Sequence, residues 1–200
     1  MQFEEEYIYH VYNRGNNLER IFFQEENYYY FLSKIKNEIV PVCNILAYCL
    51  LPNHFHFLVQ ATDKSCELYK SKTEKTLNEQ NLSKRLGLVL SSYTQGINNR
   101  YNRVGILFQQ KTKAKCLNQE RSKSDYLTLC FQYIHQNPVV AGLVEKIEDW
   151  SYPSFHEFYR QEPDRIYNLD LVHEMINLDW NNFYTQSQSL LESKDLSKIF

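Results

Sequence analysis

Two histidines one residue apart are the first residues of this chain whose types and spacing could support chemistry. His54 and His56 lie within an otherwise apolar run, residues 50–60 (LLPNHFHFLVQ). Successive side chains of a β-strand alternate between faces, so the two imidazoles share one face and Phe55 and Phe57 share the other. Two buried imidazoles without polar partners would be costly, and neutral imidazole is a common metal ligand. The pair therefore predicts a metal site, with a pair of hydrogen-bonded structural histidines as the open alternative.

A tyrosine and an asparagine on a predicted helix form the second candidate group. Tyr133 and Asn137 are four residues apart, a spacing that puts both on one helix face. Two imidazoles and an amide oxygen make an N/N/O donor set with open positions, which suits Mg²⁺ or Mn²⁺ better than structural zinc. A metal-held phosphodiester near the tyrosine hydroxyl could be attacked to give a covalent phosphotyrosine. Taken alone, a tyrosine at a helical core position is usually a packing residue.

The positive charge of the chain is concentrated in one segment. Residues 84–123 hold nine Lys and Arg against one acid, a net charge of +8, whereas the whole chain carries −2. The segment predicts a nucleic-acid-binding surface, with a solvated helix face as the alternative. The predicted nucleic-acid-binding residues are Arg14, Lys84, Arg85, Arg100, Arg103, Lys111, Lys113 and Lys115.

Local patterns predict the elements that must position these side chains. A polar stretch without apolar periodicity predicts a loop over residues 62–79. Lys111, Lys113 and Lys115 alternate within residues 106–117, and on a strand they would share one face. A helix that starts at Ser122 or Ser124 is expected to end at Pro138. Elsewhere we expect strands over residues 7–13, 42–49 and 54–61, the last two joined as a hairpin, and helices over residues 25–39 and 82–102.

Length and composition indicate one domain with its own core. The chain has 200 residues, of which 43% are apolar. No apolar run approaches the roughly 20 residues of a membrane span, and the acidic N-terminus is unlike a secretory signal. Five cysteines without a C-x-x-C pair predict reduced thiols. We therefore expect a cytoplasmic protein without disulfides.

Five short motifs follow one another between residues 7 and 155. They are residues 9–16 (YHVYNRGN), 47–59 (AYCLLPNHFHFLV), 99–109 (NRYNRVGILFQ), 133–144 (YIHQNPVVAGLV) and 150–154 (WSYPS). In this order they resemble the single-tyrosine transposases of the HUH endonuclease superfamily, in particular the REP-associated tyrosine transposases. Several co-linear motifs are far more specific than any one of them.

The resemblance implies a mixed α/β (α+β) fold. This is a ferredoxin-like core whose central antiparallel sheet carries the His-x-His strand, with helices on one face and a C-terminal helical tail. It also implies that His54, His56 and Asn137 bind Mg²⁺ or Mn²⁺ and that Tyr133 is the nucleophile. The implied reaction cuts single-stranded DNA near hairpins, leaves a 5′-phosphotyrosine and a free 3′-OH, and then transfers the strand. Members of this type often form homodimers, while those of the REP-associated branch can act as monomers, so the resemblance implies a homodimer or a monomer.

The resemblance also implies two parts of the chain and leaves two other functions open. Residues 1–155 would form the transposase domain, and residues 156–200 an acidic, aromatic C-terminal extension. A sheet with aromatic and basic side chains could instead bind single-stranded DNA or RNA without catalysis, and Tyr133 would then be structural. A metal-dependent hydrolase that uses water in place of tyrosine would release free 5′-phosphates.

Overall fold

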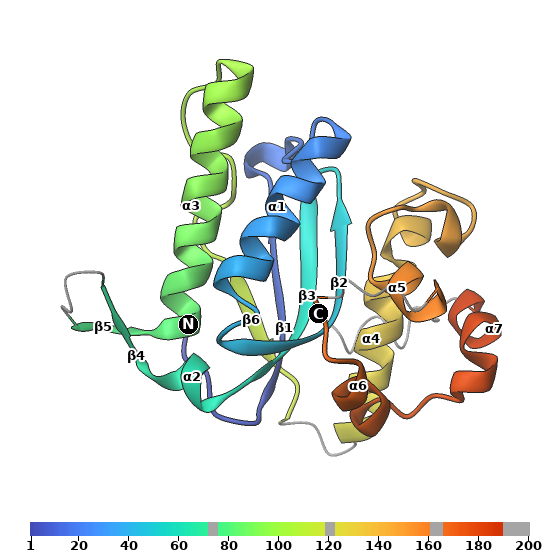
Figure 1. Ribbon diagram of the computed structural model, residues 1–200. Helices are drawn as coiled ribbons and strands as arrows, with labels where there is room; N and C mark the ends of the chain where they lie inside the picture. Colours follow the sequence, from blue (N-terminus) through green and yellow to red (C-terminus); the bar gives the residue numbers. More distant parts are fainter. Residues whose placement is uncertain (72–75, 119–122, 161–165, 190–200) are drawn as a thin grey trace.

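A four-stranded antiparallel sheet forms the centre of the molecule (Figure 1). The computed structural model describes residues 1–71, 76–118, 123–160 and 166–189. The strands run in the order β2-β3-β1-β6, and α1 and α3 connect them in a β-α-β-β-α-β ferredoxin-like arrangement. The predicted fold class is therefore confirmed. The elements of this core are β1 (Ile8–Arg14), α1 (Glu25–Glu38), β2 (Cys43–Leu51), β3 (His54–Ala61), α3 (Asn81–Tyr101) and β6 (Lys113–Cys116), with a short 3₁₀ turn at Asn16–Leu18.

The two faces of the sheet carry different side chains. Because β3 alternates, His54 and His56 share one face, and Phe55 and Phe57 share the other, as the spacing predicts. The ring of Phe31 in α1 lies 5.3 Å from the ring of Phe55 and 6.4 Å from that of Phe57, between centroids. α1 and α3 contact each other and lie side by side over this phenylalanine face (Figure 1). Both connecting helices thus lie on one face, as the fold class predicts.

A third long helix, α4 (Lys123–Val140), lies against the opposite, histidine-bearing face. It contacts β2 and β3, and its Tyr133 ring lies 5.6 Å from the His56 ring. The prediction that Pro138 ends this helix is wrong, because the helix continues to Val140. A proline in the last turn removes only one backbone donor, and the chain turns away at Gly142, whose φ is +66°.

Two shorter segments also differ from their predictions. The loop expected over residues 62–79 contains α2 (Asp63–Cys66) and a two-stranded sheet of β4 (Leu68–Lys70) and β5 (Thr76–Gln80). These elements are short and polar, so no apolar period marks them. Of the lysine-bearing stretch, only Lys113–Cys116 joins the sheet, and Lys111 precedes the strand. Ser122, one of the two expected helix starts, lies outside the described residues.

The segment after α4 packs against that helix and against the edge of the sheet. It contains α5 (Phe155–Arg160), α6 (Leu169–Met175), α7 (Phe183–Gln188) and 3₁₀ turns at Ile147–Asp149 and Trp180–Asn182. Backbone hydrogen bonds from Leu50 N to Tyr152 O (3.1 Å) and from Ser154 N to Tyr48 O (2.9 Å) cover the edge strand β2. All five cysteines are free, as predicted. Within the described ranges, no helix is both long and apolar enough to cross a membrane.

Candidate active site

A pocket of about 450 Å³ opens on the histidine-bearing face of the sheet. α4 covers β2 and β3 on this face, and the pocket lies where β1, β3, β6 and α4 meet. It brings together two predicted ligands, the predicted nucleophile and part of the predicted nucleic-acid-binding set. The lining residues that bear on chemistry are Arg14, His54, His56, Lys111, Lys113 and Tyr133.

His54 begins β3 directly after the two-residue turn that joins it to β2. Its Nδ1 lies 2.6 Å from Oδ1 of Asn53 and donates its proton to that oxygen. Nε2 of His54 therefore carries a lone pair, and it lies 3.5 Å from Oδ1 of Asn137. An amide oxygen is also an acceptor, so electron pairs face each other across this gap. A cation bound to both atoms would stabilise the arrangement, which fits His54 and Asn137 as ligands of one ion.

His56 lies deeper in the sheet, opposite Tyr12 of β1 and Cys49 of β2. It is 4% exposed, and its Nδ1 lies 2.8 Å from Nε2 of His10. Nε2 of His56 has no hydrogen-bond partner among the described residues. Burial lowers the pKa of both His54 and His56, so both rings are neutral near pH 7. Neutral imidazole is the form that binds metal ions.

The donor atoms of the site fit a divalent cation that accepts mixed ligands. The described part of the chain contains no group of three or more His, Cys, Asp or Glu side chains that could hold a metal. The candidate site instead combines His54, His56 and Asn137. The unpaired Nε2 of His56 and the close approach of Nε2 of His54 to Oδ1 of Asn137 fit the donor set of such an ion. Two nitrogens and one oxygen leave coordination positions for phosphate oxygens.

Tyr133 faces this site from α4. Its ring lies 5.6 Å from the His56 ring and 6.1 Å from the His10 ring, nearly perpendicular to both. The side chain is 6% exposed and forms part of the pocket wall. Burial raises the pKa of Tyr133 to about 12, and a hydrogen bond with Asn137 acts in the opposite direction. The hydroxyl is therefore protonated at neutral pH, and it needs a nearby positive charge to become a good nucleophile.

The predicted nucleic-acid-binding residues separate into two groups. Arg14, Lys111 and Lys113 line the pocket. Lys115 is on the same face of β6 as Lys113, but its Nζ lies 5.5 Å from the centroid of the Tyr126 ring. Lys113 and Lys115 lie on the histidine-bearing face, because β6 pairs with β1 in the same sheet, with Lys113 opposite Tyr12 and Lys115 opposite His10.

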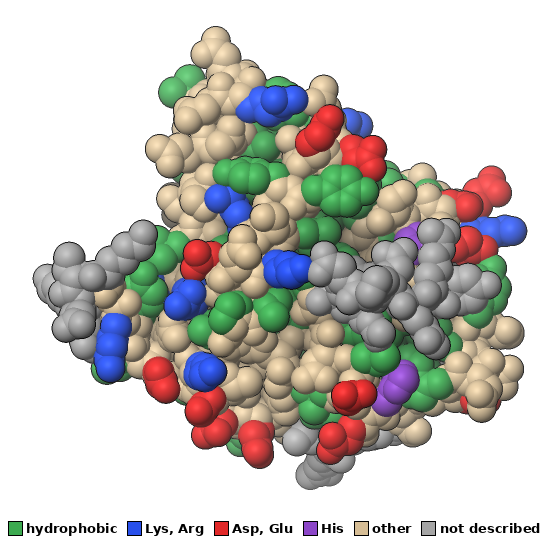
Figure 2. Space-filling view, viewed as in Figure 1, with side chains coloured by type: hydrophobic (Ala, Val, Ile, Leu, Met, Phe, Trp, Pro, Cys, Tyr) green, Lys and Arg blue, Asp and Glu red, His purple; other side chains and the backbone are tan. Residues whose placement is uncertain are grey.

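The other four basic residues lie on α3 and just after it. Ion pairs join Lys84 to Glu79 (3.8 Å), Arg85 to Glu38 (2.9 Å) and Arg103 to Glu19 (2.9 Å), and Arg100 lies 5.9 Å from the Tyr101 ring. α3 begins beside α2, which follows the end of β3 remote from His54. Figure 2 shows Lys and Arg interspersed with Asp and Glu over α1 and α3, rather than gathered in one patch. The face covered by these helices is therefore a weaker candidate for DNA than the pocket.

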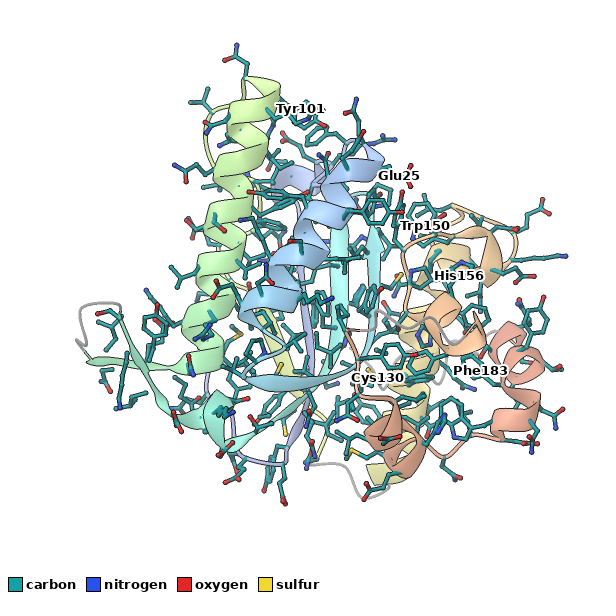
Figure 3. All side chains as sticks on the ribbon, in the orientation of Figure 1. Glu25, Tyr101, Cys130, Trp150, His156 and Phe183 are labelled. Atoms are coloured by element: carbon teal, nitrogen blue, oxygen red, sulfur yellow. The ribbon has the colours of Figure 1, made fainter. Side chains whose placement is uncertain are left out.

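The C-terminal segment supports α4 on the side away from the pocket. His135 is completely buried, and its Nε2 lies 2.8 Å from Oγ of Ser154. Gln136 donates from Nε2 to the backbone carbonyl of Ser187 (2.9 Å). Phe183 of α7 lies on the same side of α4 (Figure 3). Helix α4, which carries the candidate nucleophile, is thus held by the sheet on one side and by the C-terminal segment on the other.

Two residues of the site were not predicted from the sequence. His10 contacts His56 from β1, and Asn53 contacts His54 from the preceding turn. The first had a signal, because His10 and Tyr12 alternate in the first predicted strand and so share one face. Asn53 had no such signal, because an asparagine in the turn before a strand is typical of turns in general.

Comparison with known proteins gives a sequence relative. No family model matches the chain. The chain is similar to a protein of Haemophilus influenzae described as "Putative REP-associated tyrosine transposase", with 25% identity over 127 residues. The alignment covers 58% of this chain and 61% of the relative, so the chain spans about three fifths of that relative's length.

Solved structures give a fold relative. The chain aligns with a REP-associated tyrosine transposase bound to a REP hairpin at a TM-score of 0.57 and 14% identity, over 96% of this chain and 97% of the other. At this identity the likeness concerns the fold. A bacterial tRNA(His) guanylyltransferase-like protein in complex with GTP aligns over 72% of this chain and 70% of the other, with 15% identity and a TM-score of 0.41, too low to carry an argument. An independent sequence match and the fold therefore confirm that this chain resembles the REP-associated tyrosine transposases.

Proposed function

We propose that this protein is a transposase-type endonuclease and strand transferase that cuts single-stranded DNA near hairpins through a 5′-phosphotyrosine. The convergence of Tyr133, His54, His56 and Asn137 beside one basic pocket carries the proposal. These residues come from two motifs nearly 80 positions apart in the sequence, and packing alone does not require them to meet. The similar structure is described as bound to a REP hairpin, which supports hairpin DNA as the substrate class.

Each side chain has a role that follows from its position. Arg14, Lys111 and Lys113 bind the phosphates of the strand that enters the pocket and offset their charge. His54, together with His56 and Asn137, would hold Mg²⁺ or Mn²⁺. The ion, when bound, would polarise the scissile phosphate and neutralise the charge that grows in the transition state.

The chemical step exchanges one phosphate ester for another. Oη of Tyr133 forms a bond to phosphorus, and the bond between phosphorus and the 3′ oxygen breaks. The 3′ oxygen leaves as a hydroxyl, so the proton that it gains balances the proton that Tyr133 loses. A 3′-OH of another strand then attacks the phosphotyrosine and releases the tyrosine. The tyrosine ester retains the energy of the broken bond, so rejoining needs no further energy source.

We also propose that residues 156–200 form an accessory extension to a catalytic domain of residues 1–155. The hydrogen bond from the Gln136 side chain to the carbonyl of Ser187 supports an accessory role for the extension, because it joins the extension to the helix that bears Tyr133. In this arrangement the extension holds α4, and with it Tyr133, in position against the sheet.

The proposed function is tested by trapping the covalent intermediate. Labelled single-stranded hairpins and Mn²⁺ are incubated with the protein, and adducts are counted on a denaturing gel. Tyr133→Phe is expected to abolish adducts and to retain hairpin binding. Tyr12→Phe is the matched control, because Tyr12 lines the same pocket and its ring lies 5.8 Å from the His56 ring. This variant is expected to keep forming adducts.

The alternatives give different products. Adducts in Tyr133→Phe would exclude Tyr133 as the sole nucleophile. Free 5′-phosphates without an adduct would indicate attack by water and hence a hydrolase. Hairpin binding by the wild type without any cleavage would support the non-catalytic binding protein.

A further inference from the structure

His10 is a completely buried histidine that the proposed chemistry does not use. It lies on β1, on the same face of the sheet as His56, with Lys115 opposite it on β6. The His10 and His56 rings are stacked, with centroids 5.0 Å apart and planes 23° apart. Their contact joins Nε2 of His10 to Nδ1 of His56 at 2.8 Å. Tyr133 covers both rings, so this contact is closed off from the solvent side of the pocket.

Only one of the two possible proton arrangements lets His56 bind an ion. A neutral imidazole carries one N–H and one lone pair. If His10 donates to Nδ1 of His56, then His56 carries its own proton on Nε2, and that atom has no lone pair for a metal. If His56 donates from Nδ1, its Nε2 keeps the lone pair, and Nε2 of His10 is the acceptor. The two outer ring nitrogens of this contact, Nε2 of His56 and Nδ1 of His10, are both buried without a hydrogen-bond partner among the described residues, and of the two rings it is His56 that lines the pocket.

We infer that His10 is a positioning residue that accepts the Nδ1 proton of His56 and thereby directs the Nε2 lone pair into the ion site. The inference rests on the proposed function, since only that function requires the Nε2 lone pair of His56 to bind an ion. Metal-binding histidines commonly donate their second N–H to a fixed acceptor, which orients the ring and raises its basicity. Asn53 is the corresponding acceptor for His54, at 2.6 Å. His54 and His56 thus each have an acceptor of their own, Asn53 in the preceding turn and His10 on β1.

The location of the proton is the decisive measurement, and it needs neither DNA nor metal. Two-bond ¹H–¹⁵N correlation spectra of the histidine-labelled full chain distinguish protonated from unprotonated ring nitrogens. The His56 signals are identified by their loss in His56→Gln. We compare the wild type with His10→Gln, whose amide oxygen can still accept, and with His10→Leu, which fills a similar volume without an acceptor.

The wild type and His10→Gln are expected to carry the His56 proton on Nδ1. His10→Leu is expected to shift the proton toward Nε2. In calorimetric titrations of the DNA-free protein with Mn²⁺, His10→Leu should bind about 10–100-fold more weakly than the wild type, and His10→Gln should stay close to it. A loss of packing alone would not move the proton and would not be rescued by glutamine.

Two outcomes overturn the inference. A wild-type spectrum with the proton on Nε2 of His56 would overturn the inference by itself, even if His10→Leu does not fold. An Nδ1 proton and an unchanged Mn²⁺ affinity in folded His10→Leu would also overturn it. If the spectra agree with the inference but the wild type binds no Mn²⁺, the proposed ion site fails while the positioning of His56 by His10 stands.

Discussion

The division of the basic residues into two groups gives a quantitative prediction for DNA binding. Lys111 and Lys113 line the pocket, whereas Lys84 and Arg85 form ion pairs at the other end of the sheet. Each phosphate that a protein neutralises on a single strand contributes about −0.7 to the slope of log Kobs against log[salt]. The double change Lys111→Gln/Lys113→Gln is therefore expected to make the slope shallower by about 1.4.

The matched control removes the same number of charges elsewhere. Lys84→Gln/Arg85→Gln is expected to leave the slope unchanged, because those cations already pair with Glu79 and Glu38 and lie far from the pocket. Fluorescence anisotropy of a labelled single-stranded hairpin, measured without divalent metal to prevent cleavage, gives both slopes over a series of NaCl concentrations. If the control double variant reduces the slope as much as the pocket double variant, the pocket is not where the strand binds. An unchanged slope for the pocket double variant would also refute the claim that Lys111 and Lys113 bind phosphates of the strand.

Three further predictions concern burial. Burial lowers the pKa of His135 to about 3, so below pH 6.5 the unfolded chain binds a proton that the native state does not, and stability is lost as the pH falls from 6.5 toward 3. Between pH 7 and pH 5 this histidine should account for about 2 kcal/mol of the lost free energy of unfolding. In urea titrations His135→Gln should lack this loss and the exposed His173→Gln should keep it; equal pH dependence in both variants would contradict the assignment. Burial also raises the pKa of Cys43 to about 12, so iodoacetamide at pH 8 should modify the half-buried Cys66 well before Cys43, and mass spectra with the reverse order would show that the native core opens there. Phe31 is 0% exposed between α1 and the sheet, so Phe31→Ala should cost about 3–5 kcal/mol of unfolding free energy. A cost within about 0.5 kcal/mol, typical of surface positions, would rule out that packing role.

Local patterns in the sequence were enough to predict most of the core. Strand alternation placed His54 and His56 on one face, and their structure agrees, because the side-chain period of a strand does not depend on its neighbours. Helical periodicity likewise predicted α1 and α3 to within one residue at each end. The same local reasoning failed at Pro138, where contacts after the helix keep the last turn formed. The metal ligands and the nucleophile stay predictions that the proposed experiments test, and the predicted boundary at residue 155 stays a prediction.

Only the tertiary structure decided which of the candidate residues meet. The contact between His10 and His56 joins positions 46 residues apart, and it exists because β1 pairs with β3 in one particular register. Strand order also places Lys113 beside the histidines, whereas Arg85, in the same basic segment of the sequence, lies at the far end of α3. A sequence pattern repeats over a few residues and therefore determines which face a side chain occupies. Strand order and register depend on the burial of the apolar surface of the whole chain. They therefore determine which residues of other elements lie beside that face, and a local pattern does not show this.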